Sequence, residues 1–108
     1  LGITFKENCP DLRNSLVIKL IQKIQQYNIE VTVVDPYVDI KLAYDKYKIN
    51  VLKDLPLGNK YDVLLTAVSH QSFKNIKTKE YKTLVKDNSF FLDLKSLIPK
   101  DLNPIRIM

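Results

Sequence analysis

The pattern of apolar and polar positions changes its period along the chain, which indicates alternating strands and helices. Residues 1–5 form a short apolar run in which Thr4 and Phe5 favour a strand. Over residues 12–27 the apolar positions recur with helical spacing. Their expected buried side consists of Leu16, Val17, Leu20, Ile21 and Ile24. Residues 30–34 are mostly β-branched and are typical of a buried parallel strand.

The same alternation continues to the end of the chain. The further predicted elements are a short helix over 39–47 capped by Asp39, a strand over 49–52, a central strand over 61–68, a turn or short helix over 71–76, a helix over 79–86 and strands over 89–93 and 105–107. Strands alternating with helices of this length predict right-handed βαβ units. We therefore expect an α/β fold, a Rossmann-like three-layer sandwich with a mostly parallel sheet of about five to six strands.

The loop between the first predicted strand and the first helix is the leading candidate site. It holds Lys6, Glu7, Asp11 and Arg13 within eight residues. In open α/β sheets ligands bind at the carboxyl ends of the strands, and a guanidinium fork suits phosphate or carboxylate oxygens. The loop therefore predicts an anion-facing edge. The alternative is that these charges are solvated surface and that Asp11 caps the helix.

Three other residues are candidates for a catalytic or ligand-binding role. Cys9 has no second cysteine for a disulfide or a metal site and no histidine nearby in sequence, so nothing supports a nucleophile. Asp35 follows a strand, where nucleotide-binding folds hold a ribose hydroxyl, but with only two glycines no Gly-rich turn exists and a turn or cap role is favoured. His70 follows the central strand on the same edge as Lys6. It is either an acid or base, or a loop residue bonded to a backbone carbonyl.

Composition narrows the classes of protein. The 108 residues suit one domain, and no apolar run approaches the roughly 20 residues of a membrane-spanning helix. The net charge of +5 suggests nucleic acid at first, but the lysines are scattered rather than clustered, so we expect no nucleic acid and no membrane as partners. A single cysteine and the lack of a signal peptide favour a reduced, cytoplasmic setting. The start at Leu1, with Met108 the single methionine, indicates a piece of a longer protein.

The opening stretch GITFKENCPDLRNS resembles the start of the C-terminal domain of the UDP-glucose/GDP-mannose dehydrogenase family. The family pattern is a Gly, then Phe-Lys, then Asp-x-Arg and a small polar residue that opens a helix. The positions that fill it are Gly2, Phe5, Lys6, Asp11, Arg13 and Ser15. The wording of residues 6–11 is most similar to the branch that oxidises UDP-N-acetylhexosamines for bacterial capsule and O-antigen synthesis.

Three later stretches match family landmarks in the same order. They are VVDPYVD at 33–39, LLTAVSHQSF at 64–73 and FLDLKSLIP at 91–99. The resemblance therefore covers nearly the whole chain. It implies that residues 1–108 form a single C-terminal UDP-sugar-binding domain, a fragment of a longer dehydrogenase.

The resemblance also implies a reaction and the residues that serve it. The family performs a four-electron, NAD-dependent oxidation of a nucleotide-sugar C6 alcohol to a carboxylate. Its catalytic cysteine and most of its NAD site belong to an N-terminal half outside this chain. No catalytic or metal-binding residue is therefore expected here, and the fragment alone is expected to be inactive. By motif match Phe5 and Lys6 contact the substrate and Arg13 reaches the NAD. Lys95 stands near the position of a family arginine, so it either substitutes for that arginine or the contact is missing.

Further expectations concern partners and alternatives. The implied partners are the UDP-sugar, the protein's own N-terminal domain and a second copy in a homodimer. Two hypotheses from other classes remain open: a stand-alone α/β ligand-binding or regulatory module without catalysis, and a basic nucleic-acid-binding domain. Strong salt dependence of binding would favour the latter.

Overall fold

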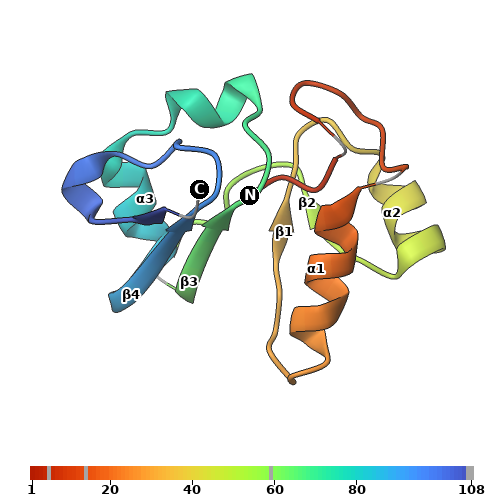
Figure 1. The fold of residues 1–108 in the computed structure, drawn as a ribbon, viewed down its shortest axis with the longest axis horizontal. Coiled ribbons are helices and arrows are strands. Elements are labelled where there is room, and N and C mark those ends of the chain that lie inside the picture. Colours follow the sequence, from red (N-terminus) through yellow and green to blue (C-terminus); the bar gives the residue numbers. More distant parts are fainter. Residues whose placement is uncertain (5, 14, 59, 107–108) are drawn as a thin grey trace.

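The computed structural model describes residues 1–4, 6–13, 15–58 and 60–106. Its elements in chain order are α1 (Leu16–Gln25), β1 (Val33–Val34), α2 (Ile40–Tyr47), β2 (Val51–Leu52), β3 (Tyr61–Thr66), the 3₁₀ helix η1 (Gln71–Asn75), α3 (Thr78–Leu84), β4 (Val85–Asp93), the 3₁₀ helix η2 (Lys100–Leu102) and β5 (Ile105–Arg106) (Figure 1). Helices and strands alternate as predicted, which confirms the α/β class.

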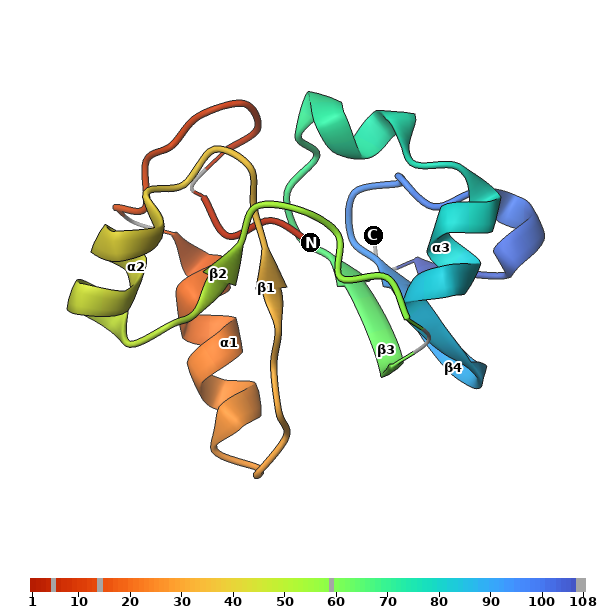
Figure 2. The same cartoon turned by 180° about the vertical axis from the view of Figure 1, so that it is seen from behind.

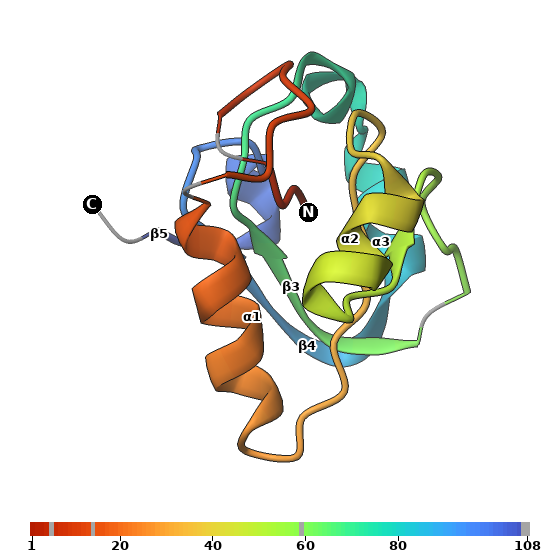
Figure 3. The same cartoon turned by 90° about the vertical axis from the view of Figure 1, so that its right-hand side faces the viewer.

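The strands form two parallel groups instead of one sheet of five to six strands. In the described part of the chain, β1 pairs with β2, and β3, β4 and β5 pair in that order. Figures 1 and 2 show α1 and α2 beside the first group and α3 beside the second. Figure 3 shows α1 on one side of the strands and α2 and α3 on the other. The expected parallel pairing is confirmed, and the expected size of the sheet is not matched.

The opening residues explain why the sheet divides. The Leu1 carbonyl accepts the Ala67 amide at 2.9 Å, and the Gly2 amide donates to the Val34 carbonyl at 2.8 Å. This segment therefore lies between β1 and β3, with a backbone hydrogen bond to β1 and another to the residue that directly follows β3. The next two amides, of residues 3 and 4, turn to the Asp35 carboxylate instead of a strand. The strand expected over 1–5 is thus absent from the described residues, and Phe5 lies outside them.

Several element boundaries differ from the sequence prediction. The first helix begins after Ser15, not after Asp11, because the Ser15 hydroxyl donates to the Ile3 carbonyl at 2.6 Å and anchors the chain there. Leu16, expected on the buried side, is 75% exposed at the end of that helix. Asp39 caps α2 as predicted, accepting the Leu42 amide at 3.1 Å.

Strand lengths also differ from expectation. Strand β1 covers residues 33–34 and is shorter than the predicted strand over 30–34, because it pairs only with the two residues of β2. The last long strand begins at Val85 rather than at residue 89, with a register shift opposite residues 61–63. Sequence periodicity reports burial, whereas strand length depends on a partner that the pattern does not name.

Two hydrophobic cores accompany the two strand groups. The first contains Ile3, Leu12, Ile18, Ile21, Val33, Val38, Ala43, Ile49 and Val51. The second contains Leu64, Tyr81, Leu84, Val85, Phe91 and Ile98. Because each core is small, the bonds of the opening segment to both groups matter for holding the domain together.

Gly2 supplies the first testable prediction. Its φ is +93°, and a Cβ added there would lie 2.6 Å from the Val68 Cβ. Gly2→Ala combines a strained backbone with a steric clash, so it should lower the free energy of unfolding by about 2–5 kcal/mol. Gly58 has a φ of +144°, but a Cβ added there would make only ordinary van der Waals contact, 3.6 Å from the Lys60 Cε. Gly58→Ala should therefore cost only about 1–2 kcal/mol. Denaturant titration measures both, and equal losses would contradict the packing of Gly2 against Val68.

Candidate functional site

The loop that carries Lys6 lies against the segment that follows β3. The Asn8 amide donates to His70 Nδ1 at 2.8 Å, and the Gln71 amide donates to Asn8 Oδ1 at 2.7 Å. Figure 1 shows the two segments, red and teal, side by side above the carboxyl ends of the strands. The prediction that Lys6 and His70 share one edge is therefore confirmed. Lys6 itself is exposed, so its ammonium is accessible to an anionic ligand.

Asp35 is the buried centre of this edge. It follows β1 and has no exposed surface. Its Oδ1 accepts the amides of Tyr37 and Val38 at 2.8 and 3.2 Å. Its Oδ2 accepts the Ile3 amide at 2.9 Å and lies 2.8 Å from His70 Nε2. Burial raises the pKa of Asp35, but hydrogen bonds from His70, Ile3 and Tyr37 outweigh it and hold that pKa below its usual value. The carboxylate is ionised and connects three segments.

The turn role predicted for Asp35 is confirmed, and its contact with His70 was missed. His70 is hydrogen-bonded to a carboxylate and to a backbone amide. The backbone carbonyl partner that one of the two expectations gave it is not the partner found. Asp35 directly follows the predicted strand over 30–34, and His70 lies two residues after the predicted strand over 61–68. Because carboxyl ends of parallel strands meet at one edge, this shared position was the signal that could have paired them.

The Arg13 guanidinium forms two hydrogen bonds with the carboxylate of Asp11, two residues earlier. Its Nε and Nη2 donate to the two Asp11 oxygens at 3.1 and 3.0 Å, and the Arg13 side chain is 80% exposed. The side-chain hydrogen bonds from Arg13 lower the pKa of Asp11. Asp11 therefore orients the guanidinium rather than capping a helix, and a phosphate would have to compete with this carboxylate for the fork.

Lys95 lies on a separate loop after β4. Its amide donates to Asp93 Oδ1 at 3.3 Å, and its side chain is exposed. Asp93 is buried, accepts the Thr66 hydroxyl at 2.6 Å and pairs with Arg106 Nε at 3.2 Å. Burial raises the pKa of Asp93, but hydrogen bonds led by that of Thr66 lower it overall. The structure thus holds the Lys95 loop at its base. Arg106 was predicted only as part of an edge strand; in the structure its guanidinium stabilises the Asp93 carboxylate.

The remaining candidates contribute less. The Cys9 thiol is half-buried and free. Phe5, the other predicted substrate contact, lies outside the described residues. No group of three metal-ligating side chains occurs in residues 1–4, 6–13, 15–58 and 60–106. Within those same ranges, every helix is too short or too polar to cross a bilayer.

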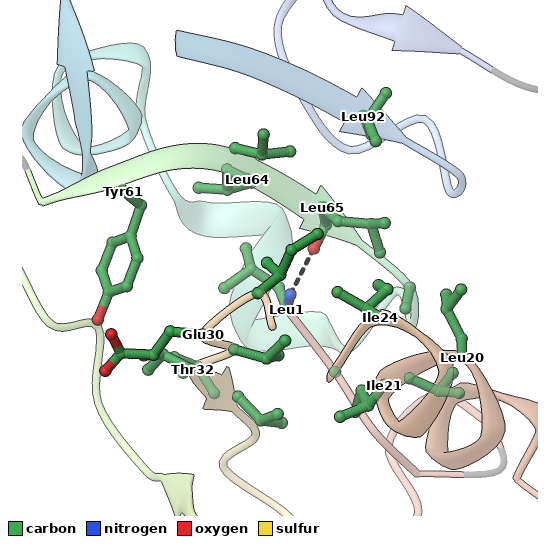
Figure 4. Close-up of a pocket in the computed structure, with 18 of the residues that line it drawn as sticks. Leu1, Leu20, Ile21, Ile24, Glu30, Thr32, Tyr61, Leu64, Leu65 and Leu92 are labelled. Carbon is green, nitrogen blue, oxygen red and sulfur yellow. Dashed lines mark hydrogen bonds between the residues drawn. The ribbon is translucent and has the colours of Figure 1, made fainter. Parts of the chain in front are cut away.

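A cavity of about 320 Å³ lies between the two strand groups (Figure 4). Leu1 is among its lining residues, and the Leu1 amino group donates to the Leu65 carbonyl. Its lining is mostly apolar and includes Leu20, Ile21, Ile24, Val33, Leu64 and Leu92. Nucleotide sugars carry pyrophosphate charge and many hydroxyls, which need polar partners when desolvated. The cavity is therefore a poor site for such a ligand, and the Lys6 edge is the candidate site.

The fold and this edge define an α/β domain that presents cations at the carboxyl ends of parallel strands. Comparison with known protein families matches most of the chain to one family. The profile of the UDP-glucose/GDP-mannose dehydrogenase family, UDP binding domain, matches residues 1–100. The chain belongs to this family. No solved structure gave a significant match.

Curated relatives agree with the family match. The chain is 38% identical over 107 residues to a UDP-N-acetyl-D-glucosamine 6-dehydrogenase of Pseudomonas aeruginosa and 34% identical over 107 residues to one of Salmonella typhi. These matches cover 99% of this chain and 25% of each relative. Protein CapL of Staphylococcus aureus is 41% identical over 103 residues, covering 94% of this chain and 23% of CapL. The chain thus spans about a quarter of the length of these relatives.

The buried carboxylate predicts a dependence of stability on pH. Since the pKa of Asp35 in the folded state lies below its ordinary 3.8, its contribution is complete above pH 3.8 and is lost as pH falls through the lower folded-state value. Asp35→Asn should cost about 2–4 kcal/mol at pH 7, because it weakens several charge-assisted hydrogen bonds, and it should reduce the acid dependence. Urea titrations between pH 7 and pH 2.5 measure both.

A matched control is Asp62→Asn, which removes an exposed carboxylate paired with Lys86 at 3.3 Å. It should change stability little at any pH. A mutant at Asp35 with the same stability and acid dependence as the wild type would contradict the role assigned to this carboxylate.

Proposed function

We propose that this chain is the substrate-binding domain of a longer NAD-dependent UDP-sugar 6-dehydrogenase that acts on a UDP-N-acetylhexosamine or a UDP-hexose. The single observation that carries the proposal is the family match over residues 1–100, whose description is a UDP binding domain. The names of two relatives support an N-acetylhexosamine substrate. A role in surface polysaccharide synthesis is proposed from the resemblance of residues 6–11 to that branch of the family. We infer a Rossmann-like arrangement and a cytoplasmic location on the same basis.

In this proposal the reaction converts the sugar C6 alcohol to a carboxylate. Two hydrides pass in turn to two NAD⁺ and one water oxygen enters the product, so that one alcohol yields one carboxylate, two NADH and protons. The catalytic groups and most of the NAD site lie in the parent protein outside residues 1–108. The fragment alone is therefore inactive in dehydrogenation. We also infer that the parent is a homodimer.

The Lys6 loop is the proposed substrate-facing edge. An exposed ammonium on a loop that is bonded at Asn8 to the neighbouring strand end is a suitable point donor to a phosphate or a forming carboxylate. Phe5, by its place in the motif, is proposed to contact the substrate beside it. Lys95 is proposed to substitute for the family arginine, from a loop whose base Asp93 holds.

Arg13 is proposed to contact NAD, which the parent binds mainly through its N-terminal domain. The planar fork fits a pyrophosphate, and the guanidinium is exposed, so an anion can compete with its present partner, the half-buried Asp11 carboxylate. The chain has only two glycines and hence no Gly-rich phosphate turn, so these residues complete a dinucleotide site rather than form one.

The test is UDP-sugar oxidation by the parent protein, followed by NADH absorbance, for wild type and Lys6→Ala. Removal of a substrate or transition-state contact should lower kcat/KM at least 10-fold, which corresponds to ~1.4 kcal/mol or more. Lys19→Ala, an exposed lysine on α1, is the matched control and should leave kcat/KM unchanged. If the wild-type parent oxidises no UDP-hexose or UDP-N-acetylhexosamine, the proposed function is wrong. The chain would then be better explained as a binding module.

A further inference from the structure

His70 occupies an unusual position for the lone histidine of the chain. Its side chain is completely buried just before η1, although it lies at the edge where ligands bind in open α/β sheets. The rings of Tyr37 and Phe73 pack against it, with centroids 4.6 and 5.4 Å away. A side chain so enclosed does not reach a substrate directly. Any effect it has on the site must pass through its bonding partners.

The hydrogen bonds determine the tautomer of the ring. The Asn8 amide is necessarily a donor, so His70 Nδ1 accepts and carries no proton. Nε2 then carries the proton and donates to Asp35 Oδ2 at 2.8 Å, with Thr4 Oγ1 at 3.2 Å as a second, longer partner. Both ring nitrogens are therefore occupied by protein groups. This arrangement suits a fixed connector and not an acid or base.

The partners of His70 lie on both sides of Lys6. Thr4 Oγ1 donates to the Lys6 carbonyl at 3.0 Å and contacts the ring on one side. Asn8 donates to the ring on the other side and adopts a φ of +57°. Asn8 Oδ1 also accepts the Gln71 amide. Thr4 and Asn8, on either side of the exposed Lys6 in sequence, are thus both hydrogen-bonded to His70.

We propose that His70 is a positioning residue for the substrate: it fixes the loop that presents Lys6, and Asp35 in turn fixes His70. This rests on the proposed function, since it takes Lys6 as a substrate contact. An unfastened loop would have to be ordered on binding, and that ordering reduces affinity. Loss of the ring should therefore raise the KM for the UDP-sugar more than it lowers kcat.

The first experiment is nuclear magnetic resonance of the 108-residue chain with ¹⁵N-labelled histidine, in which one ring gives all the signals. The expected result is a ring with its proton on Nε2 and none on Nδ1. A proton on Nδ1 would overturn the inference, because that nitrogen could not accept the Asn8 amide. Hydrogen exchange of the Asn8 amide adds a second reading. It should accelerate at least 10-fold in His70→Ala, and an unchanged rate would overturn the inference as well.

The conservative variants separate positioning from general packing. His70→Asn retains an acceptor near the place of Nδ1, and His70→Gln instead places its amide near Nε2. In the parent enzyme, His70→Ala should raise the KM for UDP-N-acetylglucosamine at least 10-fold, and His70→Asn should recover most of that loss while His70→Gln does not. Leu84→Ala, in the second core and away from the loop, controls for lowered stability and should leave KM within about 2-fold of the wild type.

The outcomes distinguish this inference from the proposed function. An unchanged KM in His70→Ala, or an equal rise in Leu84→Ala, would overturn the positioning role while the enzyme remains a UDP-sugar dehydrogenase. If the wild-type parent oxidises no UDP-sugar, the proposed function fails together with the positioning of a substrate contact. The tautomer and the exchange rate of the Asn8 amide then show only how the loop is held.

Discussion

The carboxylate of Asp35 is the interaction on which the rest of this edge depends. It is fully buried and accepts hydrogen bonds from the opening segment, from its own turn and from His70. A buried charge is tolerated only where such donors replace water. This requirement also constrains the fold, because the donors at Ile3, Thr4 and His70 lie 31 to 35 residues from Asp35 in sequence and must converge on its carboxylate.

Asp93 repeats this solution in the second half of the domain. It is the last residue of β4 and is buried. It also accepts amides from its own turn, at Leu97 and Ile98. Its cationic partner is Arg106. Each group of parallel strands therefore has a buried carboxylate at a strand end. Asp35 holds the opening segment that leads to Lys6, and Asp93 holds the loop that carries Lys95; both lysines are proposed to contact the substrate. The opening residues join the two groups by bonding to both.

The sequence predicted local structure better than it predicted partnership. Apolar runs located β3 and the helices, because burial and period are local properties. Local periodicity could not predict the divided sheet, because it arises where the amides of residues 3 and 4 donate to the Asp35 carboxylate instead of to a neighbouring strand. The helix start at Leu16 depended on Ser15 bonding to a carbonyl 12 residues earlier.

The candidate site shows the same division. The motif located Lys6 and Arg13, and the strand ends located His70 on the correct edge. The pairing of His70 with Asp35 and Asn8 was missed, because these partners are 35 and 62 residues away in sequence. What the pattern presented as isolated polar residues is one connected network beneath the Lys6 loop.

In the proposed function this domain serves a dehydrogenase that oxidises an alcohol fully to an acid. The stoichiometry of the parent protein with limiting UDP-N-acetylglucosamine and excess NAD⁺ tests this proposal, with the product analysed by mass spectrometry. Two NADH for each sugar consumed and a UDP-linked uronic acid are expected. One NADH for each sugar with an aldehyde product, or no oxidation of any UDP-sugar, would contradict it.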